Sequence, residues 1–289
     1  MFSHKTINSY FNIHRLANEN GTTSLDVVPE RGGIISKLVL GGKDILYLDE
    51  STLKDTSLSV RGGVPILFPI CGRLQDNTYS YDGKNYTMKR HGFARNFPWQ
   101  VLDIKTSEDT ASISIMQEWN NETYVSYPFK YKLIYRYIIN DKDHSLKIQS
   151  TFVNEDDKDL IFYAGFHPYF PVYDKANVEI NVPSDSYIDL FNSMDNEGNI
   201  DFAQKEVDVS YYNLQGNTCT MKDNSNDFNI ALEFDDIYKY IIVWTLEGKD
   251  FICMEPCMGS TNSLNTGKNV NTIRPNNNLS TEIKISINK

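Results

Sequence analysis

Apolar and polar side chains alternate along most of the chain, which is the pattern of β-strands that bury one face. The clearest case is the last stretch, where Ile283, Ile285 and Ile287 alternate with polar and charged residues. Helical periodicity is scarce, and residues 52–57 alone favour a short helix. The segments predicted to form strands are residues 24–28, 34–40, 79–81, 84–86, 112–119, 129–139, 145–154, 163–170, 178–182, 230–234, 240–245, 251–255 and 282–287.

Turn signals join these segments into hairpins. Asp82-Gly83 separates two short tyrosine-rich strands, and this dipeptide suits a type I′ turn. We find no linker, internal repeat or low-complexity segment. The chain is therefore predicted to be all-β, a large antiparallel β-sandwich formed by one domain over residues 1–289. The asparagine-rich residues 259–278 are the one long predicted loop, and such loops often carry function.

Composition narrows the classes of function. The chain has 28 basic and 38 acidic residues, a formal charge of -10, and we expect no nucleic-acid partner because phosphate-backbone binding needs clustered positive charge. No segment has the roughly 18 apolar residues of a membrane span or the pattern of a signal peptide, so we expect a cytoplasmic protein without membrane contact. The four cysteines lack CxxC spacing and are expected to be reduced.

The segment from Tyr163 to Phe170 carries the first candidate for chemistry. In a strand, Tyr163, Gly165, His167 and Tyr169 would share one face, while the other face is apolar. Proline after His167 favours an extended backbone there. A lone histidine on an apolar strand is more often structural than catalytic, but the tyrosine-rich face favours a functional role.

Glu255 has a similar setting, because the apolar residues 251–254 precede it and a proline follows it. Carboxylates are rarely buried unless they are paired or functional. The alternative is a structural ion pair at the rim of the strand. Glu255 and His167 together form a candidate acid/base pair.

His91 lies in a basic loop and could be an ordinary solvated histidine. The glycine- and proline-rich residues 61–73 upstream imply a constrained backbone; loops of this kind often carry function, but the pattern alone is a weak signal. No histidine or cysteine spacing typical of a metal site occurs, nor a nucleophile elbow, a Walker A loop or a dinucleotide fingerprint. We therefore expect neither a metal nor a cofactor.

Four motifs in one order give the chain a resemblance to the aldose 1-epimerase (galactose mutarotase) family, nearest its hexose-6-phosphate mutarotase-like and uncharacterised branches. They are Arg61-Gly-Gly-Val-Pro65 with Phe68-Pro69, His91-Gly-Phe-Ala-Arg95, Gly165-Phe-His-Pro-Tyr-Phe170 and Met254-Glu-Pro256. The resemblance implies a galactose mutarotase-like supersandwich and cofactor-free interconversion of the α and β anomers of a sugar. It implies that Glu255 is the general base on the anomeric hydroxyl and His167 the general acid on the ring oxygen.

The resemblance also suggests residues that bind the sugar. His91 resembles the second histidine of the family, and Arg73 and Arg61 resemble arginines of its galactose and sugar-phosphate branches. Asp189 is the candidate for an aspartate that contacts the sugar from a middle strand, although a solvated strand residue is an equal alternative.

Three functions remain open at this point. The first is a mutarotase acting on a free hexose, and the second is a mutarotase acting on a hexose phosphate, since five basic residues cluster in sequence: Arg61, Arg73, Lys89, Arg90 and Arg95. The third is a non-catalytic carbohydrate-binding or sensing protein. A sugar is the expected partner in each, and the sequence predicts no oligomeric state.

Overall fold

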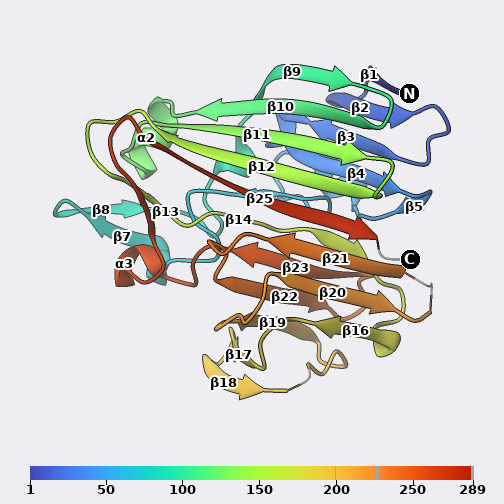
Figure 1. Cartoon of the computed structure of the whole chain (residues 1–289). Coiled ribbons are helices and arrows are strands. Elements are labelled where there is room, and N and C mark those ends of the chain that lie inside the picture. The colour runs from blue at the N-terminus through green and yellow to red at the C-terminus, as the bar shows by residue number, and fades with distance from the viewer. Residues whose placement is uncertain (199, 226–227, 288–289) are drawn as a thin grey trace.

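A computed structural model of the chain describes residues 1–198, 200–225 and 228–287. It is built mainly of antiparallel strands arranged in two large sheets, a smaller N-terminal sheet and two short ribbons (Figure 1). The all-β prediction is confirmed. Within the described residues, no helix is both long enough and apolar enough to cross a membrane.

Sheet I contains eight strands in the order β16-β20-β21-β25-β12-β11-β10-β9. Their bounds are β9 Gln100–Thr106, β10 Thr110–Glu118, β11 Tyr131–Asn140, β12 Ser145–Asn154, β16 Val178–Asn181, β20 Thr218–Asp223, β21 Phe228–Phe234 and β25 Asn278–Ile287.

Sheet II contains eight strands in the order β18-β17-β19-β22-β23-β14-β6, with β15 also paired to β23. Their bounds are β6 Ile66–Leu67, β14 Gly165–Phe166, β15 Tyr169–Pro171, β17 Ser186–Asp189, β18 Met194–Glu197, β19 Glu206–Tyr211, β22 Tyr240–Leu246 and β23 Phe251–Cys257.

The remaining elements surround these two sheets. The N-terminal sheet consists of β1 Phe2–Asn8, β2 Asn12–Asn18, β3 Ser24–Val28, β4 Ile34–Leu40 and β5 Lys43–Asp44. The ribbons pair β7 Thr78–Tyr81 with β8 Lys84–Thr87, and β13 Leu160–Phe162 with β24 Asn271–Ile273. The α-helices are α1 Glu50–Lys54, α2 Asn121–Ser126 and α3 Ser263–Thr266, and 3-10 turns cover Pro29–Arg31, Gln75–Asn77, Ala94–Asn96 and Lys175–Asn177.

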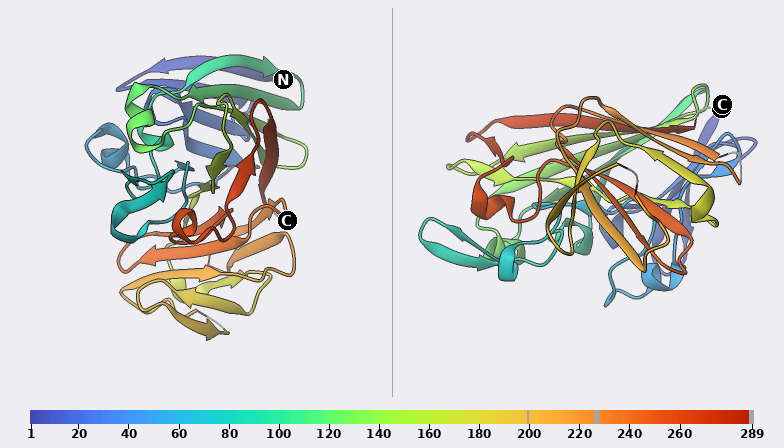
Figure 2. Two further views of the ribbon diagram at one scale, coloured as in Figure 1. Left: turned by 90° about the vertical axis from the view of Figure 1, so that its left-hand side faces the viewer. Right: turned by 90° about the horizontal axis from the view of Figure 1, so that it is seen from below.

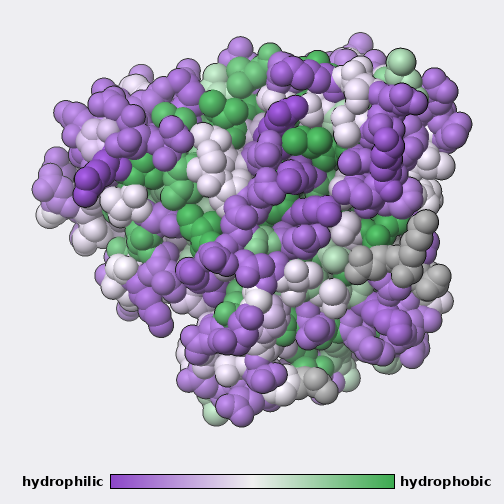
Figure 3. Space-filling view, viewed as in Figure 1, coloured by the Kyte–Doolittle hydropathy of each residue, from purple (hydrophilic) through white to green (hydrophobic). Residues whose placement is uncertain are grey.

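The core lies between sheets I and II, which form two layers (Figure 2). In β11 every second side chain is buried, and the ring of Tyr135 lies 5.7 Å from that of Phe166 in sheet II. Hydrophilic side chains cover most of the face seen in Figure 3, as expected when a strand turns its alternate residues outward.

Most predicted strands are confirmed, but several elements differ from the prediction. The predicted strand at 163–170 is two strands, β14 and β15, interrupted at His167-Pro168, because proline has no N–H for the ladder. The predicted loop at 259–278 contains α3 and β24, and Asn265 binds the backbone of β7 there. Strands β1 and β2 were not predicted because their exposed residues are largely polar. All four cysteines are free and buried.

Candidate active site

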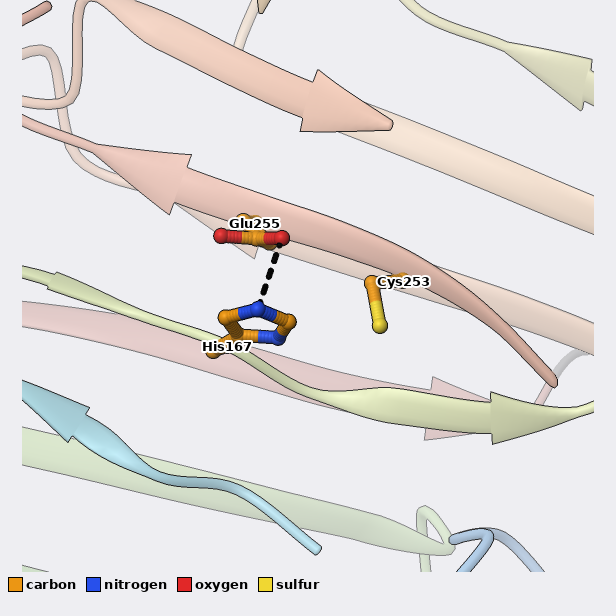
Figure 4. Close-up of side chains that lie close together, drawn as sticks. All are labelled: His167, Cys253 and Glu255. Atoms are coloured by element: carbon orange, nitrogen blue, oxygen red, sulfur yellow. Dashed lines mark ion pairs between the residues drawn. The ribbon is translucent and has the colours of Figure 1, made fainter. Parts of the chain in front are cut away.

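Glu255 and His167 meet because of the strand register in sheet II. In β23, Cys253 lies opposite Tyr169 of β15, so that Tyr169, Cys253 and Glu255 project from one face of the sheet. His167 immediately precedes the proline before Tyr169, and its Nε2 lies 3.1 Å from Oε1 of Glu255 (Figure 4). The structure thus brings together the two residues that the sequence predicts as acid and base.

Burial dominates the electrostatics of this pair. Glu255 is 2% exposed and His167 6%. Burial raises the pKa of Glu255 well above its ordinary value, and the negative charge of Asp208 adds to this effect. Burial lowers the pKa of His167 well below its ordinary value, and the positive charges of Arg95 and Arg90 lower it further. The carboxylate is therefore a stronger base than a solvated glutamate, and a proton on the imidazole is released more easily.

His91 joins this pair from the loop after β8. Its ring lies 5.5 Å from that of His167 in an edge-to-face arrangement. The backbone N–H of Gly72 donates to Nδ1 of His91 at 3.0 Å, and the backbone N–H of His91 donates to the Gly72 carbonyl at 2.7 Å. Because Nδ1 accepts a hydrogen bond, the proton of the neutral ring lies on Nε2. Burial lowers the pKa of His91 as well, which keeps the ring neutral and leaves Nε2–H as a hydrogen-bond donor.

Asp208 is a further candidate site residue, which was not predicted from the sequence. It lies in β19 opposite Trp244, which in turn lies opposite Cys253, so all three share the face that carries Glu255. Its carboxylate is almost fully buried, and Oδ2 lies 3.2 Å from the Arg90 guanidinium. The signal in the sequence was weak, because Asp208 stands between two valines but the same strand also contains Glu206 and Ser210.

Asp189, the predicted sugar-binding aspartate, is not brought to this cluster. It ends β17 opposite Val209, and Val209 follows Asp208 in β19, so Asp189 points to the other face of sheet II. Its Oδ1 accepts from the backbone N–H of Phe191 at 2.8 Å, and its Oδ2 accepts from the Asn192 amide. In this structure Asp189 shapes the turn before β18.

Arginines surround the cluster. The Arg61 guanidinium lies 5.1 Å from the Trp244 ring, and Arg73 donates to the Leu190 carbonyl at 2.8 Å. Arg95 donates to the Arg90 carbonyl at 3.1 Å. Within the described part of the chain, Arg90 is paired with a carboxylate, whereas Arg61, Arg73 and Arg95 have none within ion-pair distance. The site thus combines a buried acid/base pair with uncompensated positive charge.

Several buried polar atoms of the cluster have no hydrogen-bond partner among the residues that the structure describes. They are Nδ1 of His167, Oε2 of Glu255, Oδ1 of Asp208 and Nε of Arg95. A buried polar atom without a partner costs about 1–3 kcal/mol. A ligand with several hydroxyl groups would satisfy both the donors and the acceptors, since each hydroxyl can donate and accept.

The same region offers three atoms of the kinds that bind metals. The ligand atoms of His167, Cys253 and Glu255 lie within 4.8 Å of one another (Figure 4). A metal would need the thiolate of Cys253, but burial raises the pKa of this thiol well above its ordinary value. The nearby arginines also oppose a cation. The donor set therefore fits proton transfer better than it fits a metal ion.

Comparison with known proteins agrees with this fold. The structure of the Slr1438 protein from Synechocystis sp. PCC 6803 is similar over 99% of both chains, with 31% identity and a TM-score of 0.93. A galactose mutarotase-like protein from Clostridium acetobutylicum is similar over 100% of this chain and 99% of its own, with 20% identity and a TM-score of 0.83, which confirms the galactose mutarotase-like fold.

The sequence comparisons give the family. A Salmonella typhimurium protein described as a candidate glucose-6-phosphate 1-epimerase is 25% identical over 160 residues, which cover 55% of this chain and 49% of that protein. The sequence profile of the aldose 1-epimerase family matches residues 14–286. This chain therefore belongs to the aldose 1-epimerase family.

Proposed function

We propose that this protein is an aldose 1-epimerase that interconverts the α and β anomers of a hexose. The observation that carries the proposal is the direct contact of Glu255 with His167, inside a cluster of buried polar atoms that lack partners within the described residues. Their pKa shifts suit a base and an acid that act together. Family membership and the Salmonella relative support a reaction at the anomeric carbon.

The proposed reaction consists of two proton transfers and one bond cleavage. The Glu255 carboxylate accepts the proton of the anomeric hydroxyl, and His167 donates a proton to the ring oxygen. The bond between C1 and the ring oxygen breaks, and C1 becomes an aldehyde. Rotation about C1–C2 presents the other face of the aldehyde, and ring closure returns both protons. Glu255 has gained one proton and His167 has lost one at the open-chain stage, so the pair conserves protons and the reaction requires no cofactor.

The neighbouring residues orient the sugar in this proposal. His91 offers an Nε2–H donor, because the Gly72 amide fixes its tautomer. Asp208 offers a carboxylate oxygen that has no partner in the described part of the protein. The His91 donor and the Asp208 acceptor would bind adjacent hydroxyls of the sugar and hold its C1 against Glu255 and His167.

Polarimetry of freshly dissolved α-glucose and α-galactose tests the proposal. We expect the protein to accelerate the change in optical rotation towards the equilibrium value of at least one of these sugars. A folded protein that accelerates neither sugar, nor a hexose phosphate, would favour the carbohydrate-binding alternative.

The pH dependence of kcat/KM provides a test of Asp208. Because the pKa of Glu255 is raised, its carboxylate is lost as pH falls through a range above that of an ordinary glutamate, and activity should fall there too. Asp208→Asn removes one cause of the increase, so the acidic limb should move to lower pH. Asp189→Asn, on the other face of the sheet, should leave the limb in place; a shift in this control without one in Asp208→Asn would contradict the assignment.

A hexose phosphate is the second candidate substrate, and the uncompensated arginines favour it. Guanidinium groups form strong paired hydrogen bonds with phosphate, and Arg61 and Arg73 have no carboxylate partner within the described residues. If the natural substrate is phosphorylated, glucose 6-phosphate should be converted with a higher kcat/KM than glucose.

Arg61→Gln tests whether Arg61 recognises the phosphate group of such a substrate. Loss of one charge-assisted contact should raise KM for glucose 6-phosphate by about 10–100-fold and change KM for glucose little. Arg274→Gln, at an exposed arginine in the loop before β25, is the matched control. Equal changes for both sugars would show that Arg61 does not recognise phosphate.

A further inference from the structure

A cavity of about 970 Å³ lies against the N-terminal sheet, away from the catalytic pair. Strands β2 to β5 line one side, helix α1 lines another, and the end of β15 and the segment after it contribute Pro171 and Tyr173. None of His91, His167, Asp208 and Glu255 lines it. We name it the N-terminal cavity. Its volume lies within the range of pockets that hold small ligands.

Aromatic rings from separate parts of the chain line this cavity. Tyr10, on the turn between β1 and β2, is 71% exposed, and Tyr173, after β15, is 72% exposed. Tyr47 and Phe11 also line the cavity. Tyrosine combines an apolar ring with a hydroxyl, so it can pack on the C–H face of a sugar ring and bind its hydroxyl groups.

The charged residues in the lining are largely paired with one another. Arg15 binds Asp26 through Nε at 2.6 Å, and the Asp26 carboxylate is buried. Lys37 lies 3.1 Å from Asp44, and Lys54 lies 2.9 Å from Glu50. In total, four basic and five acidic side chains line the cavity, so its net charge is close to zero.

These properties select one class of ligand. A nearly neutral cavity has little preference for an anion or a cation, and one lined by so many charged groups is a poor site for an apolar ligand. Exposed tyrosine rings beside carboxylates, lysine ammonium groups and the Arg15 guanidinium provide both stacking surfaces and hydrogen-bond partners for a neutral molecule with many hydroxyls. We propose that the N-terminal cavity is a second carbohydrate site, which binds a neutral oligosaccharide independently of the catalytic centre.

A chain of aromatic contacts connects the two sites. The Tyr47 ring lies 5.2 Å from Phe251, which lies 4.9 Å from Tyr169, and Tyr169 stacks on His167 at 4.7 Å. The sites are therefore separated by packed side chains, and a ligand in the N-terminal cavity does not occupy the catalytic centre.

Isothermal titration calorimetry with maltotriose and cellotriose tests the proposal. We expect at least one of these neutral trisaccharides to bind both the wild type and Glu255→Gln, since the cavity does not involve Glu255. The doubly charged digalacturonate should bind no more tightly than the neutral sugars, because a nearly neutral lining does not attract an anion. The double variant Tyr10→Ala/Tyr173→Ala should weaken trisaccharide binding by about 10-fold or more, because two stacking surfaces are lost.

Two further variants test whether the aromatic rings of the N-terminal cavity are responsible for trisaccharide binding. Tyr173→Phe keeps the ring and should retain most of the affinity, whereas Tyr124→Ala, at a partly exposed tyrosine in α2, should not affect binding. If the double variant is unstable, Tyr173→Ala alone should still weaken binding. The proposal is overturned if neither trisaccharide binds, or if binding is unchanged in the tyrosine variants. Because the proposed reaction is measured separately by polarimetry, either hypothesis can fail without the other.

Discussion

Glu255→Gln is expected to lower kcat for mutarotation by about 10²–10⁴-fold while sugar binding persists. The amide keeps the shape of the side chain and its contact with His167, but it cannot accept the proton of the anomeric hydroxyl. Polarimetry would give kcat, and calorimetric titration of the sugar would give the affinity.

The same substitution should make the protein more stable. The raised pKa of Glu255 means that the folded state holds this proton more tightly than the unfolded state. This contribution to stability is complete at pH values below the ordinary glutamate pKa and is lost as pH rises through the raised pKa. The amide of the variant does not ionise and therefore loses no stability as pH rises. The free energy of unfolding of Glu255→Gln should exceed that of the wild type by an amount that grows with pH.

Urea denaturation across this pH range provides the check, with Glu233→Gln in a surface ion pair as the control. The control should keep wild-type activity and show little change in stability. An active Glu255→Gln, or a variant that is least stable at high pH, would contradict the role and the burial assigned to this glutamate.

Gly92→Ala is expected to destabilise the fold strongly. Gly92 has φ of +67°, and an added Cβ would lie 2.2 Å from the carbonyl oxygen of Phe68. The left-handed backbone alone costs an alanine about 1–2 kcal/mol, and the collision with a backbone atom must displace the loop that carries His91. We expect a total loss of about 4 kcal/mol or more in the free energy of unfolding, together with a lower kcat/KM.

Gly83→Ala is the matched control for this effect. Gly83 has φ of +70° in the turn between β7 and β8, but no atom of the described residues beyond its chain neighbours lies within 4 Å of the position of its Cβ. It should therefore lose only the backbone cost of about 1–2 kcal/mol and keep its activity. Similar losses in the two variants would show that the close approach of Gly92 to Phe68 does not position His91.

Many strands of the sandwich are predictable because their cause is local, whereas β9 and β17 to β20 were not predicted. A segment such as β11 alternates buried and half-buried residues throughout, and the Asp82-Gly83 turn fixes its own hairpin. Strands β1 and β2 lack this signal, because their pairing with each other and with β3 stabilises them more than burial does. The break at His167-Pro168 depends on the tertiary structure, since the backbone N–H of His167 donates to the carbonyl oxygen of Pro65 rather than to the neighbouring strand β23.

The candidate site was predictable in part. His167, Glu255 and His91 stand out by their residue types and motifs, and the structure places them together. The choice between Asp189 and Asp208 depends on which face of sheet II each occupies, and this follows from the pairing of β17, β19 and β22. Such long-range register cannot be read from a segment alone, because a shift of one residue exchanges the two faces.

NMR exchange spectroscopy on glucose, galactose and glucose 6-phosphate labelled with carbon-13 at C1 is the most direct measurement of the proposed reaction. In deuterated buffer, the wild type should produce exchange between the α and β signals of C1 at a rate proportional to protein concentration, with no deuterium at C2. That result is predicted because only the C1 hydroxyl and the ring oxygen exchange protons with Glu255 and His167. Absence of catalysed exchange for all three sugars, or incorporation of deuterium at C2, would contradict the account.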